Sequence, residues 1–152
     1  MKLKFCLDWF KKGLPVARGF KSESSFQLFS DYLSRIQKFI PCETAGSLDD
    51  SFKSAAGTKI WVCDRGAGSK MISSEDVSRQ IEKLQLSGCK EMKLVIGGPN
   101  GFSDSRMALI KPDFKWCFSP MTFPHELALI VASEQVYRAF CILKNLPYHN
   151  AH

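Results

Sequence analysis

Two short segments combine residue types that can hold a small polar ligand through their backbone. The first is residues 97–101, in which three glycines surround Pro99 and Asn100. Glycine has no Cβ, so its backbone can approach a ligand closely. The second is residues 119–124, which lead into a strongly periodic helical pattern, and the free N–H groups at a helix start can bind polar groups. Taken alone, the glycine segment fits a simple turn better than a ligand-binding loop.

Arg138, inside that helical pattern, has the most versatile polar side chain of the region. Its guanidinium is always charged and can hold a phosphate or a base oxygen with two hydrogen bonds. The alternative is a structural ion pair with Glu134, one helical turn earlier. His125 stands at the helix start, where ordering a loop or facing RNA fits better than acting as a base.

Tyr148 and His149 follow Pro147 near the end of the sequence. An aromatic ring and an imidazole can stack on an exposed nucleotide or hydrogen-bond to it. The alternative is a frayed terminus. His149 and His152 lack a third ligand that would make them a metal site, so we expect no metal.

Alternating strand and helix patterns must position these residues. Apolar runs predict strands at residues 3–7, 59–63, 92–96 and 115–118. Helical periodicity predicts helices over residues 24–40, from Ser73 to Gly88, from Ser103 to about Ile110, and after residue 122. Thr122 is the expected N-cap of the last helix, with Pro124 in its first turn. Residues 42–58 are polar and predict at most a short helix around 51–56.

This alternation predicts an α/β fold, a mainly parallel sheet with helices on both faces. A length of 152 residues fits one domain over the whole chain, 1–152. Ligands bind outside the carboxyl ends of the strands in such sheets. Residues 97–101, residues 119–124 and the segment after Cys63 each follow a predicted strand, so we predict that they form one small-molecule pocket. The glycine-containing turn at 65–69 matches no phosphate-binding fingerprint and is interpreted as an ordinary connection.

The overall charge favours a polyanionic partner. Lys and Arg number 21 against 15 Asp and Glu, a net charge of +6, and a basic surplus promotes binding to nucleic acid. Lys11, Lys12 and Arg18 cluster in the connection between the first strand and the first helix. They are either a solvated loop or a contact to a phosphate backbone.

The six cysteines form no C-x-x-C pair and most lie in apolar runs, which favours buried, reduced thiols. Charged residues interrupt the apolar ones at the N-terminus, unlike a signal peptide. No apolar run approaches the roughly 20 residues of a membrane span. We therefore expect a soluble, cytoplasmic protein with no membrane contact.

Four ordered motifs closely resemble the ribosomal RNA large subunit methyltransferase H family, small bacterial SPOUT enzymes. They are residues 95–103 (VIGGPNGFS), 121–125 (MTFPH), 134–140 (EQVYRAF) and 147–149 (PYH). Residues 70–75 (KMISSE) also look like family sequence. The resemblance is strong from about residue 60 to residue 149 and weak before that.

The resemblance implies a homodimer that methylates N3 of a pseudouridine in large-subunit (23S) ribosomal RNA, within the assembled ribosome, using S-adenosylmethionine. It implies a C-terminal trefoil knot that forms the cofactor pocket, and a substrate site assembled from both chains. The cofactor contacts that it implies are Cys63, Gly97, Phe118, Ser119, Pro120, Met121, Thr122 and Phe123. The catalytic candidates that it implies are Arg138, Tyr148, His149 and His125.

The sequence departs from the family in three places. Cys63 replaces the usual leucine, and Ala128 and Asn150 stand where family members usually carry basic residues. The last two changes weaken contacts to phosphate but leave the cofactor pocket untouched. One alternative is therefore a non-catalytic RNA- or ribosome-binding protein that keeps the fold. A small-molecule methyltransferase fits less well, because the chain is basic and shows no separate substrate domain.

Overall fold

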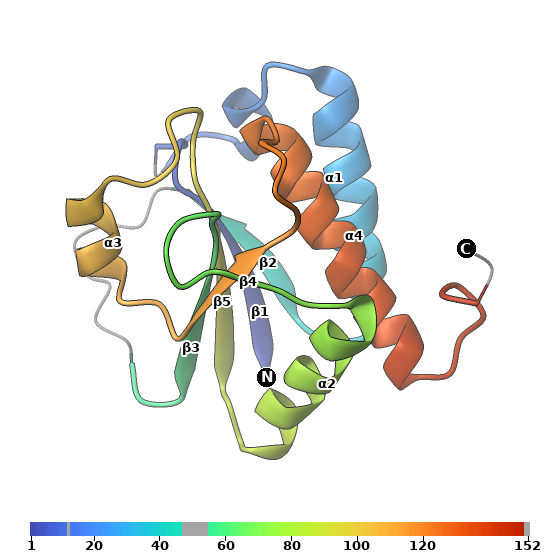
Figure 1. The fold of residues 1–152 in the computed structure, drawn as a ribbon. Coiled ribbons are helices and arrows are strands. Elements are labelled where there is room, and N and C mark those ends of the chain that lie inside the picture. Colours follow the sequence, from blue (N-terminus) through green and yellow to red (C-terminus); the bar gives the residue numbers. More distant parts are fainter. Residues whose placement is uncertain (12, 47–54, 151–152) are drawn as a thin grey trace.

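Six parallel strands form the centre of the molecule (Figure 1). The computed structural model describes residues 1–11, 13–46 and 55–150. The strand order is β2-β1-β5-β3-β6-β4, and every neighbouring pair is parallel. The strands are β1 Lys2–Leu7, β2 Cys42–Ala45, β3 Thr58–Cys63, β4 Lys70–Met71, β5 Glu91–Ile96 and β6 Phe114–Cys117. The predicted parallel sheet is confirmed.

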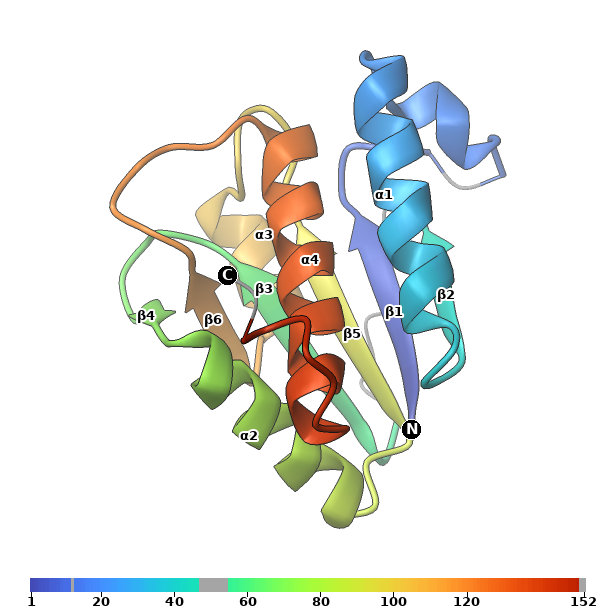
Figure 2. The ribbon, with the colours of Figure 1, turned by 90° about the vertical axis from the view of Figure 1, so that its right-hand side faces the viewer.

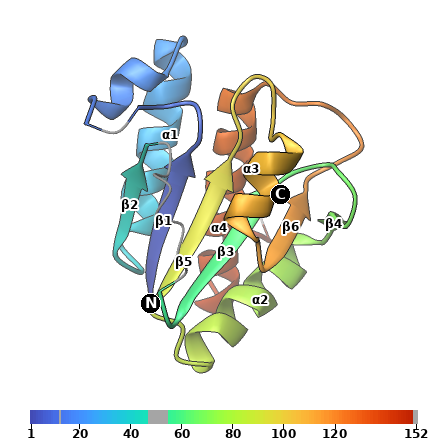
Figure 3. The same cartoon turned by 90° about the vertical axis from the view of Figure 1, so that its left-hand side faces the viewer.

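Helices cover both faces of the sheet, as predicted. They are α1 Glu23–Ile36, α2 Ser74–Leu86, α3 Asp104–Ile110 and α4 His125–Leu143, with a short 3-10 helix, η1, at Val16–Gly19. Helices α1, α2 and α4 lie together on one face (Figure 2), and α3 lies on the opposite face (Figure 3). Helix α4 packs between α1 and α2, so it joins the two halves of that layer.

Alternating side chains of the strands build the two sides of the core. In β5, Leu94 and Ile96 belong to the large apolar cluster under α1, α2 and α4, whereas Val95 belongs to a smaller cluster that contains Ile110 of α3. Successive strand side chains point to opposite faces. The apolar run at residues 94–96 of β5 is therefore explained by burial on both faces.

Serine side chains fix the starts of two helices that the sequence predicts. Ser73 accepts a hydrogen bond from the Asp76 N–H, and the Asp76 carboxylate accepts one from the Ser73 N–H, a complete capping box. At α3, Ser103 accepts from the N–H of Arg106. Each bond satisfies a backbone donor that lacks a partner inside the helix.

Several predicted boundaries are wrong. Helix α4 begins at His125, and Pro124, not Thr122, is its N-cap: the first helical bond runs from the Ala128 N–H to the Pro124 carbonyl, 2.9 Å. Helix α1 ends at Ile36, four residues before the predicted end. Strands β2 and β4 lie in segments for which the sequence pattern predicts no strand. The predicted short helix around 51–56 lies largely outside the described residues.

Candidate functional site

Three loops at the carboxyl ends of β3, β5 and β6 enclose a cavity of about 550 Å³. This volume lies in the usual range for sites that hold a small molecule or cofactor. The lining consists of residues 63–66 after β3, residues 96–102 after β5, and Trp116, Phe118, Ser119, Met121, Thr122, Phe123, His125 and Ala128 from β6 to the start of α4. The predicted convergence of the three strand-end loops is therefore observed.

The residues expected to contact a cofactor come together around this cavity. Those that line it are Cys63, Gly97, Phe118, Ser119, Met121, Thr122 and Phe123. Pro120 is not part of the lining, but its carbonyl accepts a hydrogen bond from Arg65 Nη1, 2.9 Å. That bond ties the loop after β3 to the loop after β6.

Close packing explains two glycines of the loop after β5. A Cβ on Gly97 would lie 2.9 Å from the Phe102 ring, and one on Gly98 would lie 2.9 Å from Trp9 Cβ. The Gly101 N–H donates to the Gly98 carbonyl, 2.9 Å, and Gly101 has a φ of +66°. The glycines therefore allow a tight turn packed against its neighbours, which keeps the loop backbone at the cavity wall.

Sequence reasoning missed Arg65 and Trp116 as pocket residues. Arg65 was placed in an ordinary turn, yet among the lining residues that the structure describes it is the only Arg or Lys. Trp116 is buried and packs edge-on against Phe118, with ring centroids 4.8 Å apart. Arg65 lies just after β3 and Trp116 near the end of β6. These positions at the carboxyl ends of predicted strands could have identified both as pocket residues.

His125 is the one catalytic candidate that lines the cavity. Its ring packs edge-on against Trp9, with centroids 4.6 Å apart. Burial lowers the pKa of His125, and the positive charge of Lys21 acts in the same direction, while Glu126 opposes it. The imidazole therefore favours its neutral form, which can donate one hydrogen bond and accept another.

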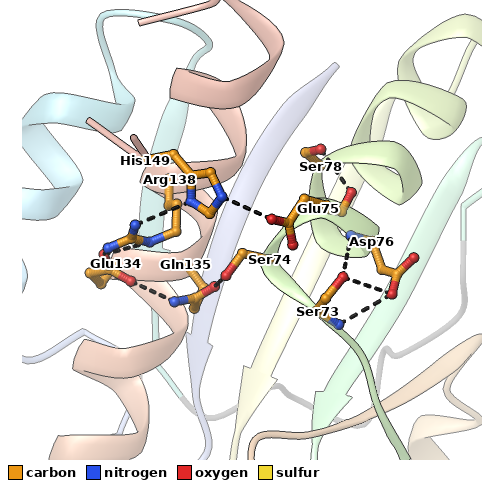
Figure 4. Close-up of polar contacts among 9 residues, drawn as sticks. All are labelled: Ser73, Ser74, Glu75, Asp76, Ser78, Glu134, Gln135, Arg138 and His149. Carbon is orange, nitrogen blue, oxygen red and sulfur yellow. Dashed lines mark hydrogen bonds and ion pairs between the residues drawn. The ribbon is translucent and has the colours of Figure 1, made fainter. Parts of the chain in front are cut away.

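The other catalytic candidates gather at a second place, which we call the polar cluster: Glu75, Glu134, Arg138, Tyr148 and His149. Figure 4 shows all of these side chains except Tyr148. Oxygen Oε1 of Glu134 accepts from Arg138 Nη2 at 2.5 Å, from Arg138 Nε at 3.0 Å and from the Tyr148 hydroxyl at 3.0 Å. The ion pair considered as the alternative for Arg138 is therefore present, and it fixes the orientation of the guanidinium.

His149 ties the end of the chain to two helices. Its Nε2 lies 2.9 Å from Glu75 Oε1 on α2, and its Nδ1 lies 3.3 Å from Arg138 Nη1 on α4 (Figure 4). The Arg138 guanidinium stacks over the Tyr148 ring at 4.9 Å. Burial, together with hydrogen bonds to Tyr32 and Glu134, raises the pKa of Tyr148, so its hydroxyl stays protonated. Residues 148 and 149 are docked rather than frayed.

The cavity and the polar cluster lie apart in one chain. His125 and Arg138 share α4 but are separated by 13 residues, about 20 Å along a helix axis. In the part of the chain that the structure describes, no residue of the polar cluster lines the cavity. The four catalytic candidates are therefore not brought together within a single chain.

Two further features bear on cysteine and metal chemistry in the described part of the chain. Burial raises the pKa of the Cys63 thiol at the cavity wall, which makes it a poor nucleophile. The described cysteines are all free. No group of three or more His, Cys, Asp or Glu gathers as a metal site among the described residues. None of the described helices has the length and hydropathy to cross a membrane.

Comparison with known families defines the class of the protein. A family model described as "Predicted SPOUT methyltransferase" matches residues 52–149, the segment that contains all three cavity loops. Two solved structures have a similar fold: a probable methylase family protein from Haemophilus influenzae Rd KW20 (TM-score 0.55, 10% identity, 95% of this chain and 69% of that chain) and a probable methyltransferase from Bordetella pertussis Tohama I (TM-score 0.53, 11% identity, 91% and 95%). The matched model assigns the chain to the SPOUT methyltransferase family, and the two solved structures share its fold.

Curated relatives identify the family. The ribosomal RNA large subunit methyltransferase H of Clostridium kluyveri is 37% identical over 117 residues, 72% of each chain. That of Clostridium acetobutylicum is 48% identical over 80 residues, 53% of this chain and 49% of that protein. The chain belongs to the ribosomal RNA large subunit methyltransferase H family, which confirms the resemblance of the four motifs. It spans about half the length of several curated relatives that it matches.

Proposed function

We propose that the protein is an S-adenosylmethionine-dependent methyltransferase that methylates N3 of a pseudouridine in large-subunit ribosomal RNA, acting as a homodimer. The observation that carries this proposal is the convergence of three loops of the matched segment on one cavity of about 550 Å³. Pockets at the carboxyl edge of a parallel sheet commonly bind cofactors.

The residues of the cavity fit this cofactor. Trp116, Phe118 and Phe123 provide apolar and aromatic surface for the adenine, and the loop backbone supplies hydrogen-bonding groups for the sugar. Arg65, the cation of the lining, suits the cofactor's carboxylate. When bound, the cofactor supplies an electrophilic methyl group on a positively charged sulfur.

The polar cluster suits the other half of the reaction. The imide nitrogen of a pseudouridine must lose its proton before it accepts a methyl group, and negative charge then develops on the ring oxygens. Arg138 holds a permanent positive charge in a fixed orientation, and Tyr148 holds a protonated hydroxyl next to it. Such preorganised donors stabilise a developing negative charge. His149 fixes the tail that carries Tyr148.

A second copy of the chain would unite the two regions. The cavity and the polar cluster are too far apart along α4 for one substrate base to contact both within one chain. Met121 at the cavity and Leu127 on the first turns of α4 expose large apolar side chains, 66% and 43% accessible. Exposed apolar surface next to a site favours an interface. We therefore propose that Arg138, Tyr148 and His149 of one copy complete the cavity of the other.

The test is to incubate the protein with labelled S-adenosylmethionine and undermethylated bacterial ribosomes and to map the labelled nucleotide. We expect one labelled pseudouridine in large-subunit RNA. Calorimetry on the folded protein supplies the second measurement: absence of binding to both S-adenosylmethionine and its demethylated product would contradict the proposal. Ribosome binding and cofactor binding without any transfer would favour the non-catalytic alternative.

A further inference from the structure

The connection between β1 and α1 carries exposed cations at the same edge of the sheet as the cavity. In Figure 3, this segment, which contains η1, lies at the end of the sheet where the loops after β5 and β6 also lie. Lys11, Arg18 and Lys21 are all exposed. We call these three residues the basic segment. Lys12 lies outside the described residues and is not part of the basic segment.

The acidic groups near the basic segment, in the chain or in space, have other partners or lie at a helix start. Asp8 forms a two-point ion pair with Arg106, at 2.6 Å and 3.1 Å. Glu126 accepts from the Ser22 N–H at 3.2 Å. Glu23 stands in the first turn of α1, where a carboxylate interacts favourably with the helix dipole.

Several cations elsewhere in the molecule are paired with acidic side chains. Lys2 and Lys4 contact Glu43, and Lys59 contacts Asp113. In the described part of the chain, by contrast, the basic segment forms no ion pair with an acidic side chain. Its positive charge is therefore left uncompensated at the edge of the sheet.

Trp9 fastens the basic segment to the cavity wall. Its indole Nε1 donates to the Gly19 carbonyl at 2.7 Å, inside the segment. Its ring packs on His125, which lines the cavity, and its Cβ lies directly against Gly98 of the loop after β5. The backbone that carries the three cations is therefore fixed beside the cavity. An RNA strand can bind them without a large loss of conformational entropy in this segment.

We propose that Lys11, Arg18 and Lys21 bind backbone phosphates of the RNA strand that flanks the target nucleotide. The inference rests on the proposed function, in which one base of an RNA enters the cavity. An enzyme that takes a base into a pocket must hold the neighbouring backbone at the rim. This basic surface also supplies contacts to phosphate at a site distinct from Ala128 and Asn150, where the chain lacks the basic residues of its family.

The experiment compares two triple variants with the same net charge. The test variant is K11E/R18E/K21E, and the matched control is K38E/K83E/K90E, which changes three exposed lysines: one in the turn after α1, one in α2 and one in the turn before β5. Each variant replaces three positive charges by negative ones and so shifts the net charge by six, from +6 to zero. Purified bacterial large ribosomal subunits serve as the binding probe, and circular dichroism checks folding.

We expect the test variant to bind large ribosomal subunits about 10- to 100-fold more weakly than the control. The slope of log affinity against log salt should fall by roughly 2 to 3, because each phosphate contact contributes about 0.7 to 0.9. Calorimetry should show the same affinity for S-adenosylmethionine in both variants and in the natural protein. The Michaelis constant for the subunits should rise, with little change in turnover at saturation.

Equal losses in the two triple variants would overturn the inference and leave the proposed function standing. A loss with an unchanged salt slope would indicate a contact to ribosomal protein and would also overturn it. If the natural protein binds S-adenosylmethionine but has no affinity for large subunits, the proposed function fails first and this inference fails with it.

Discussion

The cavity and the polar cluster are built in opposite ways from the same helix. The cavity at the start of α4 consists mostly of backbone turns that leave space between three loops. The polar cluster near the end of α4 consists of long side chains that hydrogen-bond to one another. The first region is shaped for a ligand, whereas the second holds charge in a fixed orientation. If the cavity binds the cofactor and the polar cluster activates the base, as we propose, substitutions should remove these two functions one at a time.

The largest expected effect is on turnover, from Arg138→Lys. Lysine keeps the charge but cannot make both bonds that Arg138 makes to Glu134. We expect the rate of methyl transfer at saturating cofactor to fall about 100-fold, as for loss of one preorganised donor, while affinity for S-adenosylmethionine stays unchanged. Single-turnover kinetics and calorimetry measure the two quantities.

The matched control for that variant is Arg79→Lys, since Arg79 also pairs with an acid on its own helix, Asp76, but is exposed on α2. It should retain the natural rate. A parallel loss of cofactor affinity in Arg138→Lys would show that the two regions are not separable.

Gly97→Val should lower the affinity for S-adenosylmethionine and leave the rate of methyl transfer at saturating cofactor unchanged. The new side chain would meet the Phe102 ring at the cavity wall, and overpacking of this kind costs about 1–3 kcal/mol. We expect affinity for S-adenosylmethionine to fall roughly 5- to 150-fold, the range that this free energy corresponds to. Gly46→Val is the control, because a Cβ there would lie 2.8 Å from the Phe10 carbonyl, away from the cavity. If both variants lose cofactor affinity equally, the effect reflects stability rather than the loop.

The smallest expected effect is on the pH dependence of stability. Burial lowers the pKa of His125 in the folded protein, so the unfolded chain takes up this proton more readily. Stability from His125 is therefore complete above the ordinary histidine pKa of about 6.5 and is lost as the pH falls below it. Between pH 7.5 and pH 5.5, the melting temperature of the His125→Gln variant should fall less than that of the natural protein. If the melting temperatures of the two proteins changed identically with pH in that window, this would contradict the burial of His125.

Apolar patterning was sufficient to predict most of the fold. Strands β1, β3, β5 and β6 and all four α-helices were anticipated, because their side chains must be buried on one or both faces. Strands β2 and β4 were missed. Their sequences, CETA and KM, carry little apolar signal, and they are strands only because β1 and β6 offer backbone partners. The trefoil knot and the single-domain organisation stay predictions.

The two regions differ in how far the sequence could predict them. The cavity loops follow strands of a parallel sheet, so topology alone brings them together. The polar cluster joins His149 to Glu75, residues 74 positions apart, and the cavity wall joins Trp9 to His125. Such contacts depend on tertiary packing, which no local pattern encodes.

The most direct test of the account mixes the two variants Gly97→Val and Arg138→Lys under conditions that allow subunits to exchange. The cofactor concentration is set so that the natural protein is saturated but Gly97→Val is largely unoccupied. If Arg138 of one copy completes the cavity of the other, a mixed dimer has one intact site, and statistical mixing should restore about a quarter of the natural methyl-transfer activity. Mixed dimers that form, as shown by mass spectrometry, but restore no activity would contradict a site shared between two chains.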